Sequence, residues 1–110
     1  MTFEEYQNLS KKTAKYPAVL GKNFVYPTLG LAGETGEVVE KVKKIFRDND
    51  GEVSEETKKE IAKELGDVLW YLSQVATELG ISLEEVAQGN IEKLFSRLER
   101  DKISGNGDNR

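Results

Sequence analysis

The longest helical pattern in the chain occupies residues 54–79, which read SEETKKEIAKELGDVLWYLSQVATEL. Apolar residues recur three and four positions apart in this stretch, as on one face of an α-helix. The members of this apolar stripe are Ile61, Leu65, Val68, Leu72, Val75, Ala76 and Leu79. Ser54 suits the N-cap position, and Gly80 suits the position just after the helix. The stretch therefore predicts one long amphipathic helix over residues 54–79.

Three further helices are expected around this one. Residues 3–15 begin with a capping box formed by Thr2 and Glu5, and residues 82–99 begin with a second one formed by Ser82 and Glu85. Residues 28–47 carry an apolar stripe of helical spacing, made of Leu31, Val38, Val42, Ile45 and Phe46. Residues 16–27 hold both prolines and no helical period, which predicts an ordered loop. The chain is expected to be one all-α domain over residues 1–110, ending in a Gly-rich tail at 103–110.

The composition excludes several kinds of chemistry. The chain has 110 residues with no Cys and no His, and 20 acidic residues against 16 basic ones give a net charge of −4. Disulfides, thiolate nucleophiles, zinc fingers and imidazole catalysis are therefore excluded, and any metal must bind oxygen, as Mg²⁺, Mn²⁺ and Ca²⁺ do. The acidic balance argues against nucleic-acid binding. No stretch is typical of a signal peptide or a membrane span, so a cytoplasmic protein is expected.

A short repeat pairs acidic residues on two of the expected helices. Residues 34–39 read ETGEVV and residues 64–69 read ELGDVL, which share the pattern Glu-x-Gly-acid-Val-aliphatic. At 100° per residue, Glu34 and Glu37 lie along one edge of their apolar stripe, and Glu64 and Asp67 do the same on theirs. If the stripes pack together, four carboxylates converge, and a divalent cation would relieve their repulsion. The alternative is a solvated acidic face.

Gly36 and Gly66 stand inside these helices, where each costs about 1 kcal/mol relative to Ala. Close approach of another backbone or a ligand would explain them, and a tolerated surface glycine is the alternative.

The acid pairs and their flanks resemble those of the MazG-like nucleoside triphosphate pyrophosphohydrolases. The matching flanks are LGLAG at 29–33, KELGDVLWY at 63–71, NIEKL at 90–94, Arg97, and GNGDNR at 105–110. The superfamily also contains dimeric dUTPases, dCTP pyrophosphatases and phosphoribosyl-ATP pyrophosphohydrolases. The resemblance implies a four-helix MazG-like bundle completed by oligomerisation, as a homodimer or homotetramer.

The resemblance also implies a function and a site. Glu34, Glu37, Glu64 and Asp67 would bind Mg²⁺, or Mn²⁺, while water attacks the α-phosphorus of a (d)NTP to give (d)NMP and pyrophosphate. One of the glutamates could instead activate the water. A narrower substrate (dUTP, dCTP or phosphoribosyl-ATP) is an alternative, as is a helical interaction module without catalysis.

Further residues are candidates for substrate binding, with a solvated surface position as the alternative for most of them. Cations for the polyphosphate could come from Lys44, or the nearer Lys41, and from Lys93 and Arg97, four residues apart on one helix. Arg110 and the Gly-rich tail could fold over the ligand. The nucleoside would meet Tyr71 and Asn90. Trp70 points away from the apolar stripe, which favours a role in oligomer packing.

Overall fold

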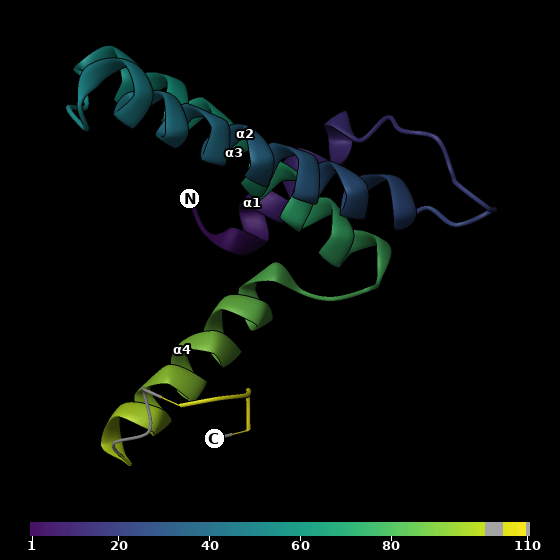
Figure 1. Cartoon of the computed structure of the whole chain (residues 1–110). Coiled ribbons are helices and arrows are strands. Elements are labelled where there is room, and N and C mark those ends of the chain that lie inside the picture. The colour runs from purple at the N-terminus through teal and green to yellow at the C-terminus, as the bar shows by residue number, and fades with distance from the viewer. Residues whose placement is uncertain (101–104, 110) are drawn as a thin grey trace.

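The computed structural model describes residues 1–100 and 105–109, and its described residues are helical with connecting loops. The elements in chain order are α1 (Phe3–Ser10), the 3-10 helix η1 (Lys11–Thr13), α2 (Val25–Asn49), α3 (Glu55–Glu78) and α4 (Leu83–Glu99) (Figure 1). The described part of the chain has no strand, although Val19 and Lys22 form an isolated bridge. The predicted all-α class with four helices is confirmed.

Helices α2 and α3 form a long antiparallel hairpin (Figure 1). The turn between them uses left-handed backbone at Asp50 (φ 53°) and Gly51 (φ 83°), and the Gly51 N–H donates to the Ile45 carbonyl at 3.2 Å. The Ser54 side chain accepts the Thr57 N–H at 3.1 Å, and Gly80 has φ 70° just after α3. The expected ends of α3 are therefore correct to one residue, because both depend on local capping.

The predicted boundaries of two helices differ from the structure, and one difference is that α2 ends at Asn49 rather than at residue 47. Helix α2 begins at Val25 rather than at residue 28, so Pro27 lies in its first turn instead of in a loop. A proline is tolerated there because the first N–H groups of a helix have no intrahelical partner. The first helix ends at Ser10 and continues only as the short η1, rather than reaching residue 15.

A polar seam joins α1 to α3. Ser73 and Gln74 are fully buried, the Gln74 side-chain amide donates to the Ser10 hydroxyl at 3.0 Å, and the Ser10 and Ser73 hydroxyls are 3.1 Å apart. Gln7 of α1 donates to the Ile81 carbonyl at 2.9 Å and accepts the Leu83 N–H at 2.8 Å. The first helix therefore holds the turn at which the chain enters α4.

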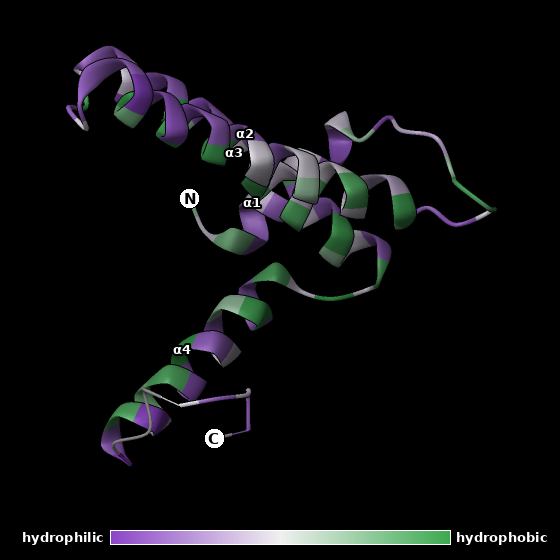
Figure 2. Ribbon diagram, in the orientation of Figure 1, coloured by the Kyte–Doolittle hydropathy of each residue, from purple (hydrophilic) through white to green (hydrophobic). Residues whose placement is uncertain are grey.

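Helix α4 projects away from the α2–α3 hairpin and does not contact α2 (Figure 1). Its apolar residues Ile91, Phe95 and Leu98 are 48%, 58% and 62% exposed, and Figure 2 shows this apolar character along the helix. The radius of gyration is 16.9 Å, against about 13 Å for a compact domain of this length. A single chain therefore does not close the four-helix bundle that the resemblance implies.

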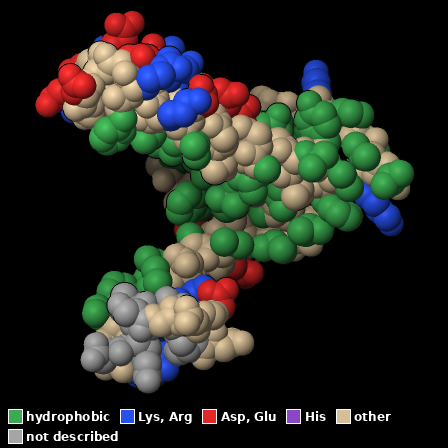
Figure 3. Space-filling model, in the orientation of Figure 1, with side chains coloured by type: hydrophobic (Ala, Val, Ile, Leu, Met, Phe, Trp, Pro, Cys, Tyr) green, Lys and Arg blue, Asp and Glu red, His purple; other side chains and the backbone are tan. Residues whose placement is uncertain are grey.

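The buried core is small for the length of the chain. The described apolar side chains that are buried include Ile45, Ala76 and Leu83. The accessible surface is 8060 Å², against about 6,100 Å² expected for a compact monomer of this mass. Figure 3 shows hydrophobic side chains over one side of the hairpin and on α4. About 2,000 Å² more surface is thus exposed than a compact chain would leave uncovered.

Candidate metal centre

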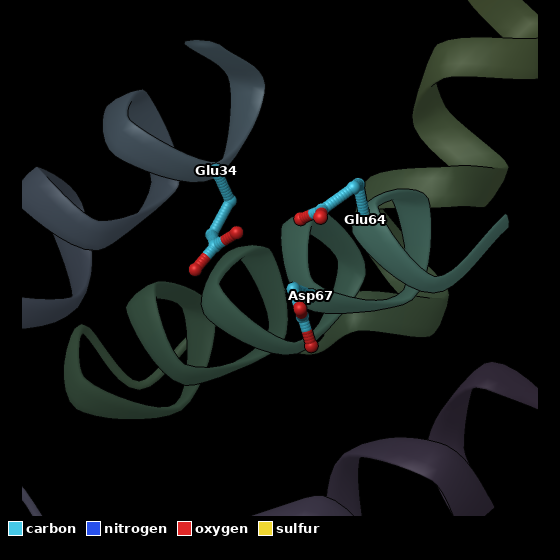
Figure 4. Close-up of side chains that lie close together, drawn as sticks. All are labelled: Glu34, Glu64 and Asp67. Atoms are coloured by element: carbon cyan, nitrogen blue, oxygen red, sulfur yellow. The ribbon is translucent and has the colours of Figure 1, made fainter. Parts of the chain in front are cut away.

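Three carboxylates from two helices meet beside the α2–α3 contact. Glu34 extends from α2, and Glu64 and Asp67 extend from α3 (Figure 4). One oxygen from each lies within 4.8 Å of the others, with Glu34 and Glu64 partly buried and Asp67 exposed. Antiparallel packing of the two helices therefore brings together residues that are about 30 positions apart in sequence.

The fourth predicted acid, Glu37, stands outside this close group. It is exposed on α2, one turn after Glu34. Its charge still contributes to raising the pKa of Glu34, so it lies near enough to act on the site electrostatically. Its role as a metal ligand stays a prediction.

The electrostatics of the group suit a cation. Burial raises the pKa of Glu34, and the charges of Asp67 and Glu64 raise it further. Carboxylates placed this way repel one another, and a hard divalent cation with oxygen ligands would favour all of them in the ionised form. The residues present therefore fit a Mg²⁺ or Mn²⁺ site.

Tyr6 of α1 lies near enough to Asp67 for the two side chains to interact electrostatically. Burial and the charge of Asp67 raise the pKa of the Tyr6 phenol, and Figure 4 shows α1 (faint purple) on the Asp67 side of the site. No pattern in the sequence assigns Tyr6 to the site, because its position depends on how α1 packs across α3.

An aromatic cluster adjoins the acids. Tyr71 is half-buried on α3, and burial, followed by Tyr26 and Glu34, raises its pKa. The Trp70 and Tyr71 rings meet edge to face at 5.0 Å, Trp70 meets Tyr16 in the same way at 6.1 Å, and Tyr16 stacks on Tyr26 at 5.8 Å. Tyr16 in the loop before α2 and Tyr26 at the start of α2 thus join the aromatic cluster around Tyr71, and the sequence did not reveal either of them individually.

The Trp70 side chain contacts other residues of its own chain. Its indole N–H donates to the Thr13 hydroxyl at 2.8 Å, and its ring packs against Tyr16 and Tyr71. These contacts hold Trp70 against its own chain, and its role in oligomer packing stays a prediction.

The two helical glycines of the repeat face open space. A Cβ added at Gly36 or Gly66 would meet nothing within 4 Å. Close approach of a backbone from the described part of the same chain, which was one explanation for these glycines, is therefore wrong.

Of the two lysines considered on α2, Lys41 lies nearer the acids. Its ammonium is 3.8 Å from a Glu64 carboxylate oxygen. Lys44 lies one turn farther along α2, with its ammonium 4.0 Å from Glu40. The structure therefore brings Lys41, and not Lys44, into contact with the acidic group.

The candidates on α4 contact the tail. The Lys93 ammonium lies 3.1 Å from an Asp108 carboxylate oxygen, and the buried Arg97 guanidinium donates to the Asp108 carbonyl at 2.5 Å. Asn90 is exposed on the same helix. Arg110 lies outside the described residues. Because α4 does not contact α2, one chain does not join these residues to Glu34.

Comparison with known proteins agrees with this geometry. Residues 27–100 match the MazG nucleotide pyrophosphohydrolase domain, and the chain therefore belongs to the MazG family. The chain is also similar to the Gene 37 protein of Mycobacterium phage L5, with 44% identity over 114 residues that cover all of both chains. No solved structure matches the chain significantly. Among the described residues, no helix combines the length and apolarity needed to cross a membrane.

Proposed function

We propose that the protein is a Mg²⁺-dependent nucleoside triphosphate pyrophosphohydrolase, which converts a (d)NTP and water into (d)NMP and pyrophosphate. Water attacks the α-phosphorus, and pyrophosphate leaves. The observation that carries the proposal is the meeting of Glu34, Glu64 and Asp67 within 4.8 Å in a chain of the MazG family. Such an activity would remove unwanted nucleotides from the cytoplasmic pool.

The acidic group is the proposed metal site. Glu34, Glu64 and Asp67 would hold the ion, with Glu37 as a fourth ligand, and Mn²⁺ would serve in place of Mg²⁺. A bound ion supplies stabilisation of the negative charge that builds on the phosphate oxygens. Glu34, whose pKa is raised, and Glu37 are the two α2 carboxylates that could take a proton from the attacking water.

The nucleoside would lie toward the aromatic cluster. Tyr71 is beside Glu34 and Asp67, as its raised pKa reflects. Its ring would contact the base or sugar once the triphosphate is on the acids. The same arrangement would serve dUTP, dCTP or phosphoribosyl-ATP, which are the narrower alternatives.

The working form is proposed to be a homodimer or homotetramer. The excess exposed surface of about 2,000 Å² per chain exceeds the roughly 800 Å² that each partner buries in a stable interface of standard size. Packing α4 against another copy would cover its apolar side, and Lys93, Arg97 and Asn90 would then be placed by the assembly. Their proposed role in binding phosphate and sugar depends on that assembly.

The test is release of pyrophosphate from a panel of NTPs, dNTPs and modified nucleotides, with and without Mg²⁺. Glu37→Gln and Asp67→Asn are each expected to abolish turnover while far-UV circular dichroism stays unchanged. Glu56→Gln, an exposed carboxylate in the first turn of α3, is the matched control and should keep full activity. Turnover that persists in both site variants contradicts the assignment of these residues.

One observation favours a second function. The exposed apolar side of α4 would also suit an interaction module without catalysis. Such a module would release no pyrophosphate from any nucleotide and give no heat with Mg²⁺ at low millimolar concentration.

A further inference from the structure

Lys41 occupies a distinctive position at the edge of the acidic group. Its ammonium lies 3.8 Å from Glu64 Oε1 and 3.8 Å from Glu60 Oε2, so it bridges two carboxylates on α3. Its side chain is 28% exposed, whereas those of Lys43 and Lys44 on the same helix are 58% and 52% exposed. Lys41 is therefore the more enclosed cation of the three.

Helix geometry explains the bridge. Lys41 lies two turns after Glu34 on α2, and Glu60 lies one turn before Glu64 on α3. In the antiparallel hairpin, Glu34 on α2 lies opposite Glu64 and Asp67 on α3. Nearer the turn of the hairpin, Lys41 on α2 lies opposite Glu60 on α3. Glu64 takes part in both sets of contacts, because it belongs to the group with Glu34 and Asp67 and also pairs with Lys41.

A cation on the acidic group and the Lys41 ammonium would act on the same carboxylate. Two positive charges this close repel each other, and the partly buried surroundings screen that repulsion less than water does. Binding of a divalent cation to the acidic group therefore weakens the ion pair between Lys41 and Glu64. Lys41 also lines a hollow with Lys44, Thr57 and Glu60, so its side chain is not packed on all sides.

We propose that Lys41 is a displaceable counter-ion of the acidic group. It neutralises Glu64 while no divalent cation is present, and cation binding releases its ammonium toward the polyphosphate of the ligand. The second half of this proposal rests on the proposed function. A lysine suits the task because it is a compact charge with three donors on a flexible stem.

The first test measures binding of the metal alone. Isothermal titration of the full-length protein with MgCl₂, repeated with MnCl₂, is compared for the wild type, Lys41→Met and Lys43→Met. Removing the competing ammonium should tighten cation binding of Lys41→Met by roughly three- to tenfold. Lys43→Met is the matched control, because Lys43 pairs with Glu40 at 2.9 Å and is well exposed, and its affinity should equal the wild type.

The result that overturns the counter-ion role is unchanged or weaker cation binding by Lys41→Met. A wild type that binds neither ion also overturns it. Circular dichroism melts of each variant verify that an altered affinity does not come from unfolding.

The second test uses inorganic pyrophosphate in saturating Mg²⁺. Lys41→Met should bind it at least roughly fivefold more weakly than the wild type, because one charged donor is lost. Lys41→Arg keeps the charge and should restore most of the affinity. Equal pyrophosphate binding by the wild type and Lys41→Met overturns the phosphate contact.

The two proposals fail in distinguishable ways. If the wild type releases no pyrophosphate from any nucleotide, the proposed function is wrong, yet the titration with metal alone still decides the counter-ion role. If turnover is found and Lys41→Met binds metal as the wild type does, only the inference about Lys41 is wrong.

Discussion

Gly30 of α2 lies directly against the ring of Tyr71 on α3: a Cβ at position 30 would be 2.5 Å from the Cζ atom of that ring. The contact involves the rigid body of an aromatic side chain next to Glu34 and Asp67. A glycine at this position therefore sets how closely α2 approaches the proposed nucleoside side of the site.

Gly30→Ala is expected to destabilise the protein by about 1–3 kcal/mol, the usual cost of forcing extra volume into a packed contact. Chemical denaturation measures the effect. Gly33→Ala is the matched control on the same helix, because a Cβ there meets nothing within 4 Å. It should be neutral or stabilising by up to about 1 kcal/mol. Equal effects of the two substitutions would contradict the contact.

Asp67→Asn is expected to remove stabilisation by divalent cations. A ligand that binds only the folded state at 100 times its dissociation constant stabilises by about 2.7 kcal/mol. Mg²⁺ should therefore raise the Tm of the wild type, and EDTA should reverse the rise. The variant should melt at one temperature in both conditions. A Mg²⁺-dependent rise that persists in Asp67→Asn would place the ion elsewhere.

The stability of the metal-free protein should depend on pH through Glu34. The pKa of Glu34 is raised in the folded state, so the folded chain holds this proton more tightly than the unfolded chain. The resulting contribution to stability is full below the ordinary pKa of 4.5 and is lost as pH rises through the raised value.

Urea unfolding in EDTA from pH 4.5 to 7.5 measures this dependence. As pH rises, the free energy of unfolding of the wild type should fall relative to that of Glu34→Gln. Saturating Mg²⁺ should cancel the shift, because the ion favours the ionised carboxylate. If the difference in stability between the wild type and Glu34→Gln does not vary with pH, the pKa of Glu34 is not raised by burial and by its acidic neighbours.

The tail contact should be separable from the rest of the fold. Asp108 joins Lys93 and Arg97, and its pKa is lowered by these two cations. Asp108→Ala should speed removal of C-terminal residues by carboxypeptidase several-fold while the thermal melt changes little. Asn106→Ala is the control with the carboxylate intact.

Deletion of residues 104–110 should raise KM or stop turnover, and unchanged kinetics would limit the tail to a structural role.

The apolar side of α4 should mediate self-association. Phe95→Glu places a charge on an exposed apolar position and should lower the mass measured by light scattering. Ser96→Glu, next to it and also exposed, should leave the mass unchanged. A wild type of 12.3 kDa in solution would contradict the proposed oligomer.

The sequence was most informative where structure depends on near neighbours. Ser54, Ser82 and Thr2 cap their helices as expected, because each cap uses groups three residues apart. Pro27 was misassigned to a loop, because a proline fits both a loop and the first turn of a helix, and only the hydrogen bonds of the following turn distinguish them.

Contacts across helices were beyond a reading of the sequence. The repeat placed Glu34, Glu64 and Asp67 on two helical edges, yet their meeting within 4.8 Å required the antiparallel register of α2 and α3. The same register put Lys41 beside Glu64 and left Lys44 outside. Tyr6 comes near Asp67, and Tyr26 comes near Tyr71, from other segments of the chain, and no local spacing could place them there.

By itself, then, the sequence determined the helices, their caps and the acid pairs on two helical edges, and it limited any metal site to oxygen ligands, because the chain has no His or Cys. The helices, caps and acid pairs depend on periodicity and on hydrogen bonds between residues a turn apart, and the type of ligand depends on composition alone. Only the tertiary structure decided which acids converge, which lysine adjoins them, where Asp108 lies and how α4 leaves the hairpin. Those outcomes depend on side-chain packing between elements that are distant in sequence. The residue pattern within a single helix does not determine such packing.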